Sequence, residues 1–314
     1  MAKFKFVIIT PVRNEEKYIS TTIKCMLKQT VKPFEWIIVN DGSRDQTEKI
    51  IMELITGNQF IRYIKLEDRG FRKPGQGVVE SFYEGFKRIE TKNYEVLAKF
   101  DGDLDFPSNT LETIARAFRE DANLGVTGGT RYERLNNHSS FKKVTVPEGF
   151  VGGPFKFYRR ECFEDIGGII RRAGWDGVDT VKANMRGWRT YEIESLKIYH
   201  LKSTGLARGE GLVKACEKYG DVSYYMGGYL FYFLMRVAMR SFQRRSFRFG
   251  YHMLKGYLKS KFKNQTRESD EFRSYFKRIQ LQRTRYWLRF LFSSLDKRRA
   301  KNNSSSSFSE SSLR

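Results

Sequence analysis

Cysteine and histidine are scarce in this sequence of 314 residues, which contains three of each. The cysteines, Cys25, Cys162 and Cys216, are widely spaced and odd in number. This spacing indicates neither a disulfide framework nor a zinc-binding pattern. We therefore expect free thiols in a reducing compartment.

Long apolar runs are also missing, since no segment offers the roughly 20 apolar residues that a membrane-spanning helix needs. The best candidate, Val222 to Met235, is an uncharged run of 14 residues that ends at Arg236, which favours an interfacial or buried helix. The apolar N-terminal segment 4–10 is too short for a signal peptide and lacks a cleavage site. It is typical of a first β-strand.

Charge is unevenly distributed along the chain. The formal net charge is +22, from 58 Lys and Arg against 36 Asp and Glu. Residues 236–299 hold 19 basic and 4 acidic residues, a balance of +15. The preceding region is mildly basic and carries most of the acids, so the chain divides into two parts of different character.

Short β-rich runs alternate with helical patterns in the first half of the chain. The expected strands cover residues 4–10, 35–40, 61–66 and 94–100. The expected helices cover residues 15–29, 45–54, 77–89 and 107–119. This alternation predicts a doubly wound, parallel α/β sheet, followed after Leu124 by a glycine-rich half with mixed sheet. Ligands of such sheets bind beyond the carboxyl ends of the strands.

Three of these strand ends are followed by carboxylates, amides and glycine. The segments are Pro11 to Glu16, Asn40 to Asp45 and Asp101 to Asp105. Each alone could be a polar turn, but acids gathered on one rim repel one another unless cations or ligands offset the repulsion. Asp101 and Asp103 can share a hard divalent cation with a diphosphate. The sequence therefore predicts one site on this rim.

Taken in order, the three segments resemble family-two glycosyltransferases of the GT-A fold. The matching runs are Val7-Ile-Ile-Thr-Pro-Val-Arg-Asn-Glu-Glu, Trp36-Ile-Ile-Val-Asn-Asp-Gly-Ser-Arg-Asp and Lys99-Phe-Asp-Gly-Asp. The resemblance covers roughly residues 4–200 and is to a bacterial and archaeal branch associated with surface polysaccharides. It implies an inverting transfer of a sugar from a nucleoside-diphosphate donor, with UDP the first expectation. The acceptor would be a hydroxyl of a glycan or lipid-linked molecule.

The resemblance also implies roles for individual residues. Asp41 would bind the nucleotide base, and Asp101 and Asp103 would hold Mn²⁺ or Mg²⁺ and the donor diphosphate. His200, at the end of a predicted strand, would be an additional metal ligand, and a structural histidine is the alternative. Further candidates for contact with the base, ribose, phosphate or sugar are Pro11, Arg13, Asn14, Glu15, Asp68 and Gly102.

A general base must take the proton from the acceptor hydroxyl. The family usually supplies it from a Glu-Asp pair about a dozen residues before a glycine turn. Counting back from Gly187 points to Asp176, with Trp175 in place of the glutamate and Asp179 as the competitor. A helix N-cap followed by an exposed acid is the alternative interpretation.

We expect a catalytic domain over residues 1–201, a helical, basic, membrane-associated extension over 202–299 and a disordered tail over 300–314. Basic residues interleave with aromatics, Trp287 among them, which suits an anionic membrane surface. Nucleic acid is not expected as a partner because no recognition motif accompanies the charge. The resulting hypothesis is a cytoplasmic enzyme at the inner face of the cell membrane. A polyprenyl-phosphate sugar synthase and a catalytically silent nucleotide-sugar-binding protein are the alternatives.

Overall fold

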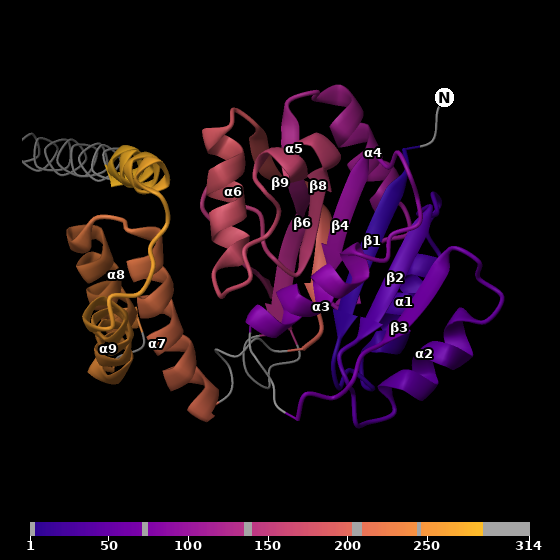
Figure 1. Ribbon diagram of the computed structural model, residues 1–314, viewed down its shortest axis with the longest axis horizontal. Helices are drawn as coiled ribbons and strands as arrows, with labels where there is room; N and C mark the ends of the chain where they lie inside the picture. Colours follow the sequence, from indigo (N-terminus) through magenta and orange to yellow (C-terminus); the bar gives the residue numbers. More distant parts are fainter. Residues whose placement is uncertain (1–3, 71–74, 135–139, 203–208, 244–245, 285–314) are drawn as a thin grey trace, which may run out of the picture.

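The computed structural model describes residues 4–70, 75–134, 140–202, 209–243 and 246–284. The tail expected over 300–314 and Trp287 lie outside these residues. Figure 1 shows a twisted sheet with helices on both of its faces and a separate group of helices at one side.

The strands form one mixed sheet in the order β3-β2-β1-β4-β8-β6-β9-β5, with β7 paired to β6. The first four of these run parallel, whereas β8 is antiparallel to both β4 and β6. The strands are β1 Phe6–Val12, β2 Glu35–Asn40, β3 Ile61–Lys65, β4 Val96–Phe100, β5 Leu104–Asp105, β6 Leu124–Arg134, β7 Phe141–Lys143, β8 Phe155–Arg159 and β9 Arg189–His200. The expected parallel half followed by a mixed half is confirmed.

Helices cover both faces because successive side chains of a buried strand point to opposite sides. Phe6 and Ile8 of β1 belong to the core beneath α1, α2 and α4, while Val7 and Ile9 belong to the core beneath α3, α5 and α6. These helices are α1 Ile19–Leu27, α2 Thr47–Ile55, α3 Gln76–Phe86, α4 Thr110–Glu120, α5 Arg160–Asp165 and α6 Trp175–Met185.

Two element boundaries near the rim differ from the expected ones. Strand β1 continues through Pro11 to Val12. Its pairing with β4 ends at Ile9, so Pro11 forfeits no ladder hydrogen bond on that side. Helix α1 starts at Ile19, later than expected, because Asn14 adopts a left-handed conformation with φ 54° and the chain turns there before the helix begins.

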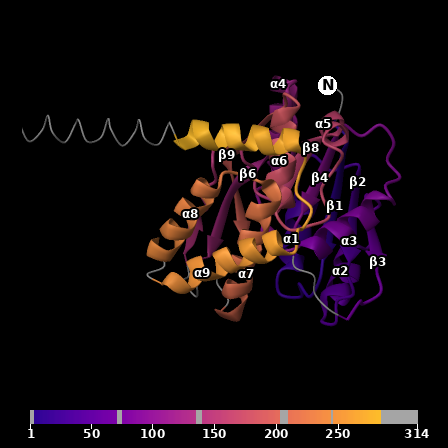
Figure 2. The ribbon, with the colours of Figure 1, turned by 60° about the vertical axis from the view of Figure 1, so that its left-hand side comes forward.

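The C-terminal helices form a small group of their own, visible in Figures 1 and 2. They are α7 Gly209–Met226, α8 Leu230–Gln243, α9 Phe247–Phe262 and the helical residues 270–284. Their contact with the α/β part of the chain is direct, because Phe272 packs with Val178 and Val181 of α6. Within the described ranges, no helix is both long enough and apolar enough to cross a membrane.

Candidate active site

Asp101, Asp103 and His200 come together at the carboxyl end of β4. The pairing of β5 with β9 sets Leu104 opposite His200 and so brings the imidazole beside Asp103. The Nε2 atom of His200 lies 3.1 Å from Asp103 Oδ2 and 3.9 Å from Asp101 Oδ2. One ligand atom from each of the three residues lies within 4.8 Å of the others.

Glu133 on β6 orients the His200 ring from the other side. The Nδ1 atom of His200 lies 3.2 Å from Glu133 Oε1, and Arg131 Nε lies 3.0 Å from the same oxygen. Burial lowers the pKa of His200, but hydrogen bonds to Asp103 and Glu133 outweigh it and raise that pKa to about 10. A carboxylate behind a histidine is the usual support of a metal-binding imidazole.

This set of donor atoms fits a hard or borderline divalent cation. Carboxylate oxygens suit Mg²⁺ and Mn²⁺, and imidazole is acceptable to Mn²⁺. Lys99 and His200 now contact these carboxylates, and a bound cation would compete with both for them.

Gly102 is the residue between the two aspartates for a steric reason. A Cβ atom at this position would lie 2.7 Å from Cγ1 of Val12 and 3.4 Å from Cδ1 of Ile19. Only glycine lets the turn after β4 pack this closely against β1.

Glu15 lies close enough to the aspartates for their charges to affect it. Burial, then the charge of Asp103, raise the pKa of Glu15 to about 7, even though Lys202 forms an ion pair with it. The Oε2 atom of Glu15 is buried and has no hydrogen-bond partner among the residues that the structure describes. A buried acceptor without a partner costs about 1–3 kcal/mol, so a ligand hydroxyl or cation would stabilise it.

Lys99 was not identified from the sequence, although it contacts the site directly. Its side chain is buried in β4 and forms an ion pair with Asp101. The ammonium also donates to the carbonyl of Gly153 at 3.3 Å and lies 5.2 Å from the ring centroid of Trp175. A lysine in an otherwise apolar strand was the only signal available.

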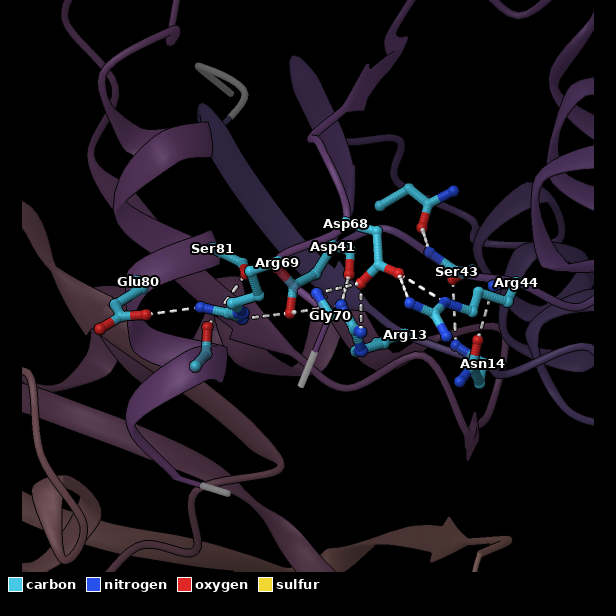
Figure 3. Close-up of polar contacts among 12 residues, drawn as sticks. Arg13, Asn14, Asp41, Ser43, Arg44, Asp68, Arg69, Gly70, Glu80 and Ser81 are labelled. Carbon is cyan, nitrogen blue, oxygen red and sulfur yellow. Dashed lines mark hydrogen bonds and ion pairs between the residues drawn. The ribbon is translucent and has the colours of Figure 1, made fainter. Parts of the chain in front are cut away.

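A second polar cluster surrounds Asp41 at the end of β2 (Figure 3). The Asp41 carboxylate pairs with Arg69, which also contacts Glu80 at 2.5 Å. Arg13 donates to the backbone carbonyl of Asp41 and to Asp68 at 2.6 Å. Hydrogen bonding from Arg13 is the largest cause that lowers the pKa of Asp68 to about 2.

Beside this cluster lies a cavity of about 370 Å³, whose lining includes Asp41, Leu66, Arg69, Ser81 and Arg171. The loop after β2 approaches Asp68 closely at Gly42, which has φ +66°. A Cβ at Gly42 would lie 2.5 Å from Cα of Asp68, so the position requires glycine.

Asn14 ties the loops after β1 and β2 together. Its backbone N–H donates to Ser43 Oγ at 3.0 Å, and its side-chain oxygen accepts from the Arg44 N–H at 2.9 Å. Pro11 lies within β1 itself. Pro11 and Asn14 therefore shape the backbone of the rim next to Arg13.

The two acids of α6 occupy very different surroundings. Asp179 is fully buried, where Lys156 donates to it at 2.7 Å and the hydroxyl of Tyr158 also donates to it. Burial raises the pKa of Asp179 despite Lys156. Asp176 is half-buried in the first turn of α6. A Cβ added at Gly153 would lie 3.0 Å from the Cβ of Asp176. Gly153 thus lies between Asp176 and Lys99.

The structure therefore groups the predicted residues into three sets. Asp101, Asp103 and His200 meet at the rim, with Glu15 close by. Asp41, Asp68 and Arg13 form the cluster beside the cavity. Asp176 lies behind Gly153, whereas Asp179 faces Lys156 and Tyr158 in the interior.

Comparisons with known proteins agree with this architecture. A family model described as "Glycosyl transferase family 2" matches residues 7–171. Glycosyltransferase GlyA of Streptococcus pneumoniae serotype 4 is 25% identical over 221 residues, which cover 65% of this chain and 32% of GlyA. This chain therefore spans about a third of the length of that relative.

Two solved structures share the fold at low sequence identity. Mannosyltransferase PcManGT from Pyrobaculum calidifontis, in complex with GDP-Man and Mn²⁺, is 14% identical with a TM-score of 0.52, covering 70% of this chain and 62% of that one. GalNAc-T7 with UDP, GalNAc and Mn²⁺ is 12% identical with a TM-score of 0.55, and the match covers 82% of this chain and 58% of that one. The fold expectation is confirmed.

Proposed function

Since this chain belongs to glycosyl transferase family 2, we propose that it transfers a sugar from a nucleoside-diphosphate donor to an acceptor hydroxyl, with inversion at the anomeric carbon. The observation that carries the proposal is the convergence of Asp101, Asp103 and His200 at the rim of the sheet. Mn²⁺ bound by these three residues would neutralise the charge that develops on the departing diphosphate, as would Mg²⁺.

The nucleoside of the donor occupies the cavity beside Asp41 in this proposal. The Asp41 carboxylate accepts an N–H of the base once Arg69, its present partner, moves aside. Arg13 remains on the backbone carbonyl of Asp41 and on Asp68, so it fixes the wall of the cavity. Glu15, whose Oε2 has no partner within the described part of the chain, accepts a ribose hydroxyl. We propose a UDP-sugar as the donor.

Asp176 is the general base of this proposal. Asp179 cannot reach an acceptor without losing its bonds to Lys156 and Tyr158. Lys156 also donates to the backbone carbonyl of Asp176 at 2.8 Å, which fixes the first turn of α6. The acceptor oxygen forms its bond to the anomeric carbon while its proton passes to Asp176 and the bond to the diphosphate oxygen breaks on the opposite face.

The acceptor side of the proposal is a glycan or lipid-linked hydroxyl in cell-surface polysaccharide or glycolipid synthesis. The enzyme would then act in the cytoplasm, at the inner face of the cell membrane. The basic, aromatic helices after residue 209 support this location, since anionic lipid attracts such segments.

A panel of nucleotide-sugars with Mn²⁺ tests the proposal through release of the nucleoside diphosphate. Asp103→Ala should lose activity about a hundredfold or more, because several kcal/mol of charge stabilisation disappear. Asp105→Asn, which alters an acid outside the trio, is the matched control and should retain activity. Equal turnover of wild type and Asp103→Ala would refute the metal site.

Asp176→Asn tests the base separately. It should lower kcat about 10²- to 10⁴-fold while donor binding, measured by calorimetry, is unchanged. Activity that survives this change would favour a phosphate acceptor, as in a polyprenyl-phosphate sugar synthase. Binding without any turnover in the wild type would indicate a silent nucleotide-sugar-binding protein.

A further inference from the structure

The outward face of α8 is apolar along its whole length. Phe231, Leu234, Ala238 and Phe242 recur at helical spacing and are all exposed, with Phe231 at 72% and Phe242 at 87%. A helix on the surface of a soluble domain normally presents polar residues to water at these positions. This face is therefore built for contact with something other than water.

Packing among the described residues does not account for these side chains. The opposite face of α8 supplies Phe233 and Val237 to a buried cluster with Cys216 of α7 and Met253 of α9. The helices thus already have a core of their own. Apolar residues on both faces of α8 mean that the outer set has no role in that core.

Helix α9 also carries an exposed apolar stripe, with charge beside it. Phe247, Tyr251, Leu258 and Phe262 lie on one stripe by helical spacing, and Phe247 and Phe262 are 89% and 81% exposed. A second exposed stripe runs alongside it and consists of basic residues. These are Arg248 and Lys259, with Lys255 between them paired to Glu217 at 2.9 Å.

We propose that these outer stripes of α8 and α9, called here the lipid face, dock the enzyme on an anionic lipid bilayer. Aromatic and aliphatic side chains enter the boundary between headgroups and acyl chains, while the basic stripe meets the lipid phosphates. The aromatic side chains of this face could stack on bases, but the exposed aliphatic residues among them, such as Leu234 and Leu258, could not, so the mixed face fits a bilayer better than RNA. A second copy of this chain also fits the lipid face less well than a bilayer does, because the basic stripes of the two copies would repel each other.

The lipid face is connected to the proposed catalytic base through one helix. Figures 1 and 2 show α8 and α9 on the side of α7 that faces away from the catalytic sheet. Val222 of α7 packs on Gly174, where a Cβ would lie 2.5 Å from Val222 Cγ1. Gly174 is the N-cap of α6, two residues before Asp176. Docking would hold the acceptor end of the site near the membrane, a consequence that rests on the proposed function.

Co-sedimentation of the full chain with vesicles tests this docking. The vesicles are phosphatidylcholine alone or phosphatidylcholine with phosphatidylglycerol. The wild type should bind the anionic vesicles, and binding should weaken as salt is raised. Phe242→Ser with Phe247→Ser should weaken binding about tenfold or more, because two side chains no longer bury apolar area. Arg248→Glu with Lys259→Glu should weaken it by a similar factor.

Matched controls lie on the catalytic domain. Phe34→Ser changes an aromatic side chain that is 44% exposed, and Lys24→Glu reverses an exposed charge on α1. Both should bind vesicles as the wild type does. Donor hydrolysis with Mn²⁺ in vesicle-free buffer should be equal in all variants, which shows that each is folded and separates this inference from the proposed function.

Three outcomes would overturn the inference. One is equal binding of the wild type to neutral and anionic vesicles, and another is unchanged binding by both lipid-face variants. The third is self-association in place of vesicle binding. Light scattering would then show a dimer of the wild type that Phe242→Ser dissociates, and the wild type would not bind vesicles. If the wild type does not hydrolyse the donor, that result counts against the proposed function. Vesicle co-sedimentation would still test the docking.

Discussion

Replacing Lys156 with methionine should destabilise the protein strongly, because it leaves the Asp179 carboxylate buried without its cation. The ammonium of Lys156 is fully buried and donates to Asp179 at 2.7 Å, to Thr180 Oγ1 at 3.0 Å and to the Asp176 carbonyl at 2.8 Å. Breaking a buried ion pair from one side costs about 3–5 kcal/mol. That is a large part of the roughly 5–15 kcal/mol by which folded domains are stable.

Urea unfolding followed by circular dichroism measures this cost as a shift of the midpoint at unchanged slope. Lys156→Met combined with Asp179→Asn should recover more than half of the loss, since no charge is then left unpaired. In the double variant the new amide oxygen would still accept the Tyr158 hydroxyl. A double variant that is less stable than Lys156→Met alone would refute the view that Asp179 acts as the buried ion-pair partner of Lys156. Asp179 would then again be a candidate for the general base.

Two further predictions concern groups that support the site and the sheet. Glu133→Gln should weaken Mn²⁺ binding about 10- to 100-fold without loss of fold, because the His200 ring loses its carboxylate partner. Calorimetric titration measures the affinity, and an unchanged value would refute the supporting role of Glu133. Glu35→Gln should cost about 1 kcal/mol at neutral pH. Burial raises the pKa of Glu35, but the Thr91 N–H and Arg62 outweigh it and lower that pKa below its ordinary 4.5. The contribution of Glu35 to the free energy of unfolding is thus present above pH 4.5 and is lost as pH falls through the lowered pKa. The urea midpoints of wild type and variant should therefore converge in acid.

The parallel half of the fold could be predicted because its strands are short apolar runs that end abruptly in polar residues. Residues 35–40 form β2 as expected, and the strand ends after β1, β2 and β4 do share one rim. Local sequence was sufficient there, since strand composition and helix periodicity are local properties. The C-terminal helices followed from their aromatic and basic composition in the same way.

Contacts between distant segments could not be predicted by these local patterns. His200 reaches Asp103 only because β5 pairs with β9, and Glu133 reaches His200 because β6 pairs with β9 in parallel. Lys99 and Lys156 face each other across β4 and β8. Charged residues inside strands normally argue against burial, so no local pattern could place two lysines beneath the site.

The acids of the rim are compensated by the protein itself, which bears on how a donor would bind. The sequence predicted that cations or ligands must offset their repulsion, and the cations are side chains of this chain. Asp101 pairs with Lys99, Glu15 with Lys202 and Asp41 with Arg69. A donor that engages Asp41 must therefore displace Arg69, so binding exchanges one ion pair for another set of contacts. Such an exchange adds little net electrostatic energy. Under the proposed function, the affinity for the donor would then depend on how many hydrogen bonds the cavity provides, and shape and hydrogen bonding, rather than charge, would select the nucleotide.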